Sequence, residues 1–159
     1  MVAQKAAAFL AAAIPVAADT TVVKACQRNW PIDKRDCSKF ARDVAADCEV
    51  TLVGDANDIV RTLTAETDGW KRLENGVAAA ASAGAGKLVV GGLQGDKQAS
   101  PNMHGHVVVV VPGELDRDLY PTAYWGSLGG TPYESKTINY AWVPADRDRV
   151  IYAEHDITQ

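Results

Sequence analysis

The stretch Gly105-His106-Val107-Val108-Val109-Val110-Val111 decides what fold we expect for this chain. Five consecutive valines favour extended backbone, because β-branched side chains pack well on a pleated surface. An apolar run without polar alternation is typical of a strand that is buried on both faces. We therefore predict that residues 106–111 form a central strand of a sheet.

The rest of the chain from residue 87 to the C-terminus also has a strand-like pattern. Short runs rich in Val, Ile, Tyr and Trp are separated by clusters of Gly, Pro and Asp, a pattern typical of a meandering antiparallel sheet. The further predicted strands are 88–91, 123–127, 138–143 and 150–154. The predicted loops between them are 94–103, 112–121 and 129–136.

The first half of the chain has helical periodicity instead. Apolar residues recur at helical spacing from Val22 until Pro31, which we expect to end that helix. A second helix is predicted over 37–47 with Asp36 as its N-cap, a third opens near residues 54–57, and a fourth spans 77–83. Helices followed by an antiparallel sheet define the α+β class, with the helices on one face of the sheet.

Length and composition fit one domain. The 159 residues are 47% hydrophobic and 23% charged, an ordinary balance for a globular protein. A net charge of −4 argues against a protein that binds nucleic acid, since neutralising phosphates requires clustered Lys and Arg. We therefore expect a single domain over 21–159 and no nucleic-acid partner.

Residues 1–20 are set apart by an Ala-rich apolar run after Lys5. The run ends in small residues, as a secretory signal does, but an N-terminal helix or a flexible extension fits equally well. It is too short to span a bilayer, and Pro15 interrupts it, so we expect no stable membrane insertion.

The chain has three cysteines, Cys26, Cys37 and Cys48, so at least one thiol is free. If the protein works outside the cytoplasm, a bridge between Cys26 and Cys48 is our hypothesis. Cys37 differs from the other two because it stands at a helix start, where unpaired backbone N–H groups favour a thiolate. An imidazole on an adjacent strand would complete a nucleophile, and His106 has that position. The alternative is an inert buried cysteine.

The sequences on both sides of this candidate site resemble one family. Asp36-Cys37-Ser38-Lys39-Phe40-Ala41 is similar to the Asp-Cys-Ser-Gly-Phe-Val signature of NlpC-type cell-wall peptidases, and Gly105-His106-Val107-Val108-Val109 is similar to their Gly-His-Val strand. Within that papain-like superfamily, the chain resembles the first family of type VI secretion peptidoglycan amidase effectors. The segments that carry this resemblance are 25–30, 54–60, 120–127 and 146–152.

The resemblance implies a papain-like NlpC-type fold and a function. Cys37 is expected to be the nucleophile and His106 its base, in hydrolysis of the γ-D-glutamyl–meso-diaminopimelate amide of the peptidoglycan stem peptide, without metal or cofactor. We expect Ser38, Trp125 and Ser127 to contact the substrate. The expected partners are the type VI secretion apparatus and a cognate immunity protein, and the expected place of action is the periplasm of a target bacterium.

Two departures and three alternatives accompany this interpretation. Lys39 stands where the family has Gly, and either contacts a substrate carboxylate or points into water. No polar residue stands out as the third group that orients the imidazole, so a backbone carbonyl is one candidate. The alternatives are a metal site that combines His104 and His106 with His155 or Cys37, a silent wall-binding module, and a Cys-His hydrolase of another amide.

Overall fold

The computed structural model describes residues 20–158 and has an α+β architecture. Its centre is a six-stranded sheet in the order β1-β6-β2-β3-β4-β5, in which every neighbouring pair is antiparallel. The strands are β1 (Lys71–Leu73), β2 (Leu88–Leu93), β3 (His106–Val110), β4 (Thr122–Trp125), β5 (Tyr133–Thr137) and β6 (Ile151–His155). The helices are α2 (Thr21–Asp33), α3 (Cys37–Asp47), α4 (Ala56–Ala65), α5 (Gly76–Gly84) and α6 (Pro144–Arg147), with short 3-10 turns η1 (Gly95–Lys97) and η2 (Ile138–Tyr140).

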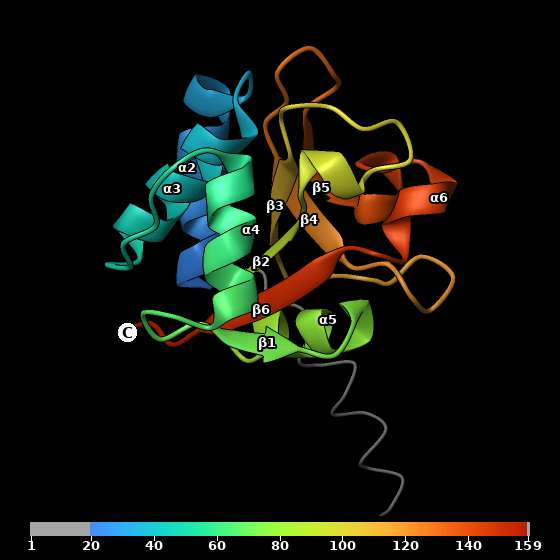
Figure 1. Cartoon of the computed structure of the whole chain (residues 1–159). Helices are drawn as coiled ribbons and strands as arrows, with labels where there is room; N and C mark the ends of the chain where they lie inside the picture. The colour runs from blue at the N-terminus through green and yellow to red at the C-terminus, as the bar shows by residue number, and fades with distance from the viewer. Residues whose placement is uncertain (1–19, 159) are drawn as a thin grey trace, which may run out of the picture.

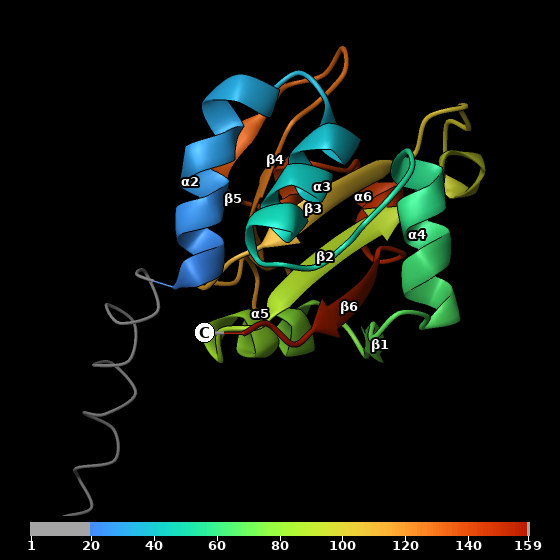
Figure 2. The same cartoon turned by 90° about the vertical axis from the view of Figure 1, so that its left-hand side faces the viewer.

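Three of the helices cover one face of the sheet. Figure 1 shows α2, α3 and α4 on the same side, and Figure 2 looks onto them with the sheet behind. Their apolar stripes, which include Phe40, Val44 and Ile59, form one core with alternate side chains of the strands, such as Val107 and Val109. These helices begin where the sequence places capping side chains, because such a side chain accepts the unpaired N–H groups of the first turn.

The opposite face has its own core. Val108 and Val110 point to this side, where they pack with Trp125, Trp142 and Tyr152. Helix α5 also packs on this face, so the expectation that all helices lie on one side of the sheet is wrong for α5. Its small alanines allow a close approach to the strands. Val107–Val110 are completely buried, which confirms the prediction of a central strand covered on both faces.

The sequence misplaced several boundaries in the second half. The predicted strand 138–143 is η2 and the turn after it, and β5 begins inside the predicted loop 129–136 and ends one residue beyond it. Strand β1 was not predicted. Both missed strands are sheet edges with largely exposed side chains, so they lack the apolar alternation by which strands are predicted.

Two predictions concern the N-terminal part. Helix α2 continues through Pro31 and ends at Asp33, because a proline in the last turn removes only one of the final hydrogen bonds. The predicted signal or extension over residues 1–20 lies almost entirely outside the described residues. Among residues 20–158, no helix is long and apolar enough to cross a membrane.

Candidate active site

Cys37 is the first residue of α3, and Asp36 caps this helix. The Asp36 carboxylate accepts the backbone N–H groups of Ser38 and Lys39, each at 3.1 Å, and the Ser38 hydroxyl at 2.9 Å. Burial acts to raise the pKa of Asp36, but these hydrogen bonds outweigh it, so the pKa lies below its usual range. The charge of Asp36 is therefore used to start the helix that positions the thiol.

The Cys37 thiol is buried, with 9% of the residue exposed. The pKa of Cys37 is raised to about 11: burial is the main cause, the charge of Asp36 acts in the same direction, and the backbone N–H group of Val107 opposes both. Helix α3, which begins with Cys37, packs against β3, which begins with His106. At neutral pH the isolated group is a thiol, so it needs a base to become a nucleophile.

His106 begins β3 and is half-buried. Burial lowers the pKa of its imidazole to about 4, so the ring is neutral at physiological pH. Gly105 before it is required by packing, since a Cβ at this position would lie 2.6 Å from Oδ1 of Asn57 and 3.0 Å from the carbonyl oxygen of Leu93. The Gly-His pair thus brings the head of β3 close to the start of α4.

Cys37 and His106 line the same pocket, which has a volume of about 120 Å³. Of the other residues predicted to contact substrate, Ser38 and Ser127 line it as well. Trp125 does not line the pocket. Its side chain is only 1% exposed, and its ring lies edge-on to His106 with a centroid distance of 6.4 Å. The remaining lining residues are Asp36, Asp55, Ala56, His104, Gly105 and Leu128.

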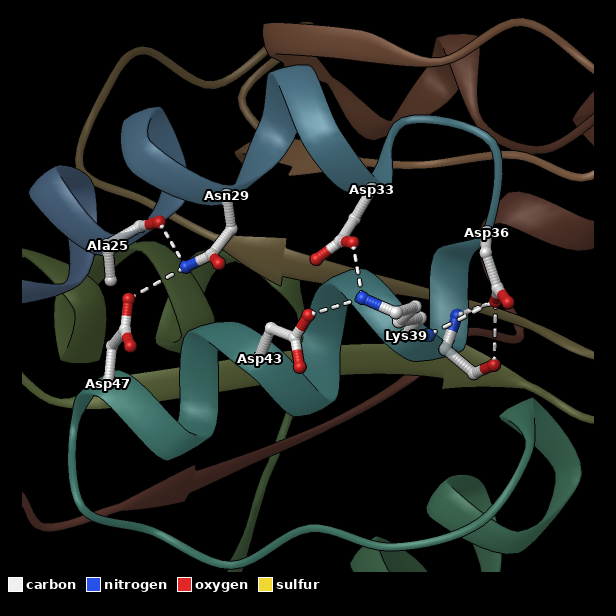
Figure 3. A network of polar contacts seen from close by, with 8 residues as sticks. Ala25, Asn29, Asp33, Asp36, Lys39, Asp43 and Asp47 are labelled. Atoms are coloured by element: carbon white, nitrogen blue, oxygen red, sulfur yellow. Dashed lines mark hydrogen bonds and ion pairs between the residues drawn. The ribbon is translucent and has the colours of Figure 1, made fainter.

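Lys39 points neither into this pocket nor freely into water. Its ammonium group bridges two carboxylates, Asp33 on α2 at 2.8 Å and Asp43 one turn along α3 at 2.9 Å (Figure 3). Asp33 is buried, and this burial is the main reason why the pKa of its carboxyl lies above the usual range. The lysine in place of the family's glycine therefore partners a buried acid and ties α2 to α3.

The other two cysteines are buried free thiols in the structure, so the hypothesised bridge between Cys26 and Cys48 is not present. Within residues 20–158, no group of three or more His, Cys, Asp or Glu side chains is arranged to hold a metal ion. His104 is exposed at the pocket. His155 is half-buried at the end of β6, against Trp70.

Two residues that sequence reasoning missed hold the loop that leads to His106. Asn57 accepts the N–H of Gly95 at 2.9 Å and donates to the carbonyl oxygen of Met103, also at 2.9 Å. Asp146, which is buried, accepts the N–H of Ala99 at 2.7 Å. Both residues lie in segments that carry the family resemblance, and this resemblance was the one sequence signal that could have pointed to them.

The opposite end of the pocket is fixed by Gly126. A Cβ on this residue would lie 2.5 Å from the carbonyl oxygen of Asp33 and 2.8 Å from that of Asp36. Next to it, Ser127 donates its backbone N–H to the carbonyl oxygen of Lys34 at 3.0 Å. The end of β4 is thereby held against the turn that carries Asp36 and Cys37.

The fold and the site together define a class: papain-like α+β proteins in which a cysteine at a helix start and a histidine at a strand start share one pocket. No protein-family model matches the sequence. The chain is 35% identical over 145 residues to the peptidoglycan amidase Tse1 of Pseudomonas aeruginosa, an alignment that covers 84% of this chain and 88% of that protein. The chain belongs to the Tse1 family of type VI secretion amidase effectors.

Proposed function

We propose that this protein is a peptidoglycan amidase in which Cys37 is the nucleophile and His106 the general base. Membership of the Tse1 family supports the substrate, since Tse1 is a peptidoglycan amidase. The observation that carries the assignment of residues is the pocket that the Cys37 and His106 side chains share. The thiol stands at the start of α3, where Asp36 takes the N–H groups of Ser38 and Lys39 and the backbone N–H of Cys37 itself can stabilise developing negative charge.

The proposed reaction has two halves. The Cys37 thiol gives its proton to His106, and the sulfur attacks the amide carbonyl carbon. The resulting oxyanion is held by the Cys37 backbone N–H and one further donor. When the C–N bond breaks, His106 gives the proton to the leaving amine. Water, deprotonated by His106, then attacks the thioester and releases a carboxylate and the thiol.

Burial determines the resting protonation state of this pair. It raises the pKa of Cys37 to about 11 and lowers that of His106 to about 4, because each charged form alone is poorly solvated. The pair therefore rests as thiol and neutral imidazole. The two charges arise together, on proton transfer, and each then stabilises the other.

The bond that we propose is the γ-D-glutamyl–meso-diaminopimelate amide of the stem peptide, as in the family that the sequence resembles. Ser38 and Ser127 line the pocket. The Ser127 hydroxyl can donate a hydrogen bond to the peptide, whereas the Ser38 hydroxyl, which donates to Asp36, can accept one. In this proposal the protein is an antibacterial effector, delivered by a type VI secretion apparatus into the periplasm of a target bacterium. A cognate immunity protein protects the producing cell.

The test is digestion of purified sacculi, with release of new amine termini as the signal and mass spectrometry of the fragments to identify the bond. Cys37→Ala and His106→Ala should abolish release. Cys48→Ala is the matched control, because it removes another buried free thiol of the same helical layer and should leave release unchanged. Undiminished release by the Cys37 or His106 variant would refute the residue assignment, and fragments cut at a different amide would refute the proposed bond.

A further inference from the structure

The imidazole of His106 lies against two indole rings. The Trp142 ring is 5.1 Å away between centroids at an interplanar angle of 67°, and the Trp125 ring is 6.4 Å away at 88°. Both contacts are edge-on, an arrangement that aromatic rings favour. Among residues 20–158, no side chain or carbonyl forms a hydrogen bond with the His106 nitrogens. Aromatic contact is therefore what orients this ring.

The two tryptophans are held in different ways. Trp125 donates its indole N–H to the carbonyl oxygen of Thr131 at 3.1 Å and packs on the Tyr133 ring. The Trp142 indole N–H is buried and has no acceptor. A buried donor without a partner is unfavourable, so it calls for an explanation. Of the two indole rings, that of Trp142 lies closer to His106. We infer that this contact compensates for the unpaired N–H and keeps the Trp142 ring in its position.

The backbone of Trp142 is fixed by the turn at 146–149. Arg147 donates to the carbonyl oxygens of Trp142 at 3.3 Å and Asn139 at 3.1 Å. Asp146, beside it, holds the N–H of Ala99 in the loop before His106. One short turn thus connects the segment that carries Trp142 with the loop that leads to the imidazole.

We propose that Trp142 is the positioning residue of His106: its indole, anchored through Arg147, sets the orientation of the imidazole at the wall of the Cys37 pocket in place of a polar third group. The proposal rests on the proposed function. The indole also covers one side of the imidazole and keeps water from it. Since burial is what lowers the pKa of His106, removal of the indole should move that pKa upward.

Two substitutions distinguish the contribution of the Trp142 ring from that of its indole N–H. Trp142→Leu removes the aromatic contact, and Trp142→Phe keeps a ring but removes the unpaired N–H. For Trp142→Leu we expect kcat on soluble muropeptides to fall by about tenfold to a hundredfold with little change in KM, the result of a misplaced base. The apparent pKa of the acid limb of the pH profile should rise by about one unit or more. Trp142→Phe should retain most of kcat and the wild-type acid limb.

Trp70 offers a matched control far from the pocket. Its ring lies edge-on to His155 at a centroid distance of 5.1 Å and an angle of 70°, and its indole N–H is likewise buried without a partner. Trp70→Leu should therefore lower thermal stability about as much as Trp142→Leu, without changing the acid limb. If Trp70→Leu shifts the acid limb equally, the effect is one of general destabilisation and the proposal fails.

An NMR titration of the His106 ring makes the outcome independent of activity. The ring signal, assigned by its loss in His106→Gln, should titrate at higher pH in Trp142→Leu than in the wild type. An unchanged titration in Trp142→Leu overturns the proposal, and so does a Trp142→Phe protein as impaired as Trp142→Leu. If the titration shifts as expected but wild-type protein releases no amine from sacculi, the proposed function fails while the Trp142 contact stands.

Discussion

Two histidines of this protein pack edge-on against a tryptophan, at opposite ends of strand β2. His106 pairs with Leu93 at one end of that strand, and His155 pairs with Leu88 at the other. Each ring centroid lies 5.1 Å from an indole, that of Trp142 or Trp70. The similarity ends at the ring nitrogens. Those of His155 are 2.7 Å and 2.8 Å from the carbonyl oxygens of Asp156 and Asp68.

The difference shows what a catalytic histidine requires from its surroundings. Both nitrogens of His155 face carbonyl oxygens, so this ring links the end of β6 to the loop before Trp70, and neither nitrogen is open to a thiol or a substrate. His106 is held by aromatic packing, and no hydrogen bond from residues 20–158 occupies its nitrogens. A ring held in this way keeps a nitrogen free for the Cys37 thiol.

Replacing each histidine by glutamine should produce opposite effects. His106→Gln should lower kcat/KM by roughly 10² to 10⁴-fold, the usual contribution of general acid–base catalysis, with little loss of stability. His155→Gln should leave kcat/KM within about twofold of wild type. It should cost about 1 kcal/mol of stability, since the carbonyl contacts are lost. Amine-release kinetics and urea unfolding measure the two effects, and a His155→Gln protein without activity would contradict the comparison.

The second prediction concerns pH. His106 can act as a base only when it is neutral, so kcat/KM should fall as the pH drops through its pKa. Because burial lowers that pKa to about 4, activity on soluble muropeptides should persist well below the pKa of an ordinary histidine. The check is a series of kcat/KM measurements between about pH 3.5 and pH 8, a range that includes both the ordinary and the lowered histidine pKa. An acid limb near 6.5, about the ordinary histidine value, would show that the imidazole is solvated.

The smallest expected losses of activity come from replacing the glycine that lies against each histidine or its neighbours. A Cβ on Gly105 would lie 2.6 Å from Oδ1 of Asn57, and one on Gly69 would lie 2.6 Å from Nε2 of His155. Gly105→Ala and Gly69→Ala should each cost about 1–3 kcal/mol of stability through overpacking. At Gly69 the φ of +92°, which is unfavourable for alanine, contributes as well. Only Gly105→Ala should also lower kcat/KM, by about tenfold or more, because it displaces the head of β3. Thermal unfolding and amine release distinguish the two, and equal losses of activity would contradict the account.

The sequence predicted those parts of the site that depend on local signals. Asp36 followed by an apolar stripe at helical spacing predicted α3 with its first residue and its cap, and the valine run predicted the central strand. These signals are strong because a cap and a buried strand are each specified within a few residues. The pairing of Cys37 with His106 followed from a cysteine at a helix start and a histidine at the head of an adjacent strand, and the family resemblance supported it.

What the sequence could not predict depends on contacts between distant segments. Trp142 lay in a predicted strand and Trp125 was expected at the substrate, yet both pack behind the imidazole. One of the two carboxylates that Lys39 contacts is Asp33, on the preceding helix, and no periodicity indicates that contact. The edge strands β1 and β5 escaped prediction because pairing with a neighbouring strand, and not burial, makes them extended.

A double-mutant cycle on kcat/KM for amine release tests most directly whether Cys37 and His106 act as one unit. Cys37→Ser, His106→Ala and the double variant would be measured on the same muropeptide, with folding checked by circular dichroism. If the thiol depends on the imidazole for its activation, the double variant should be no slower than the slower single variant. If the two losses instead multiply in the double variant, the residues contribute independently and the account is wrong.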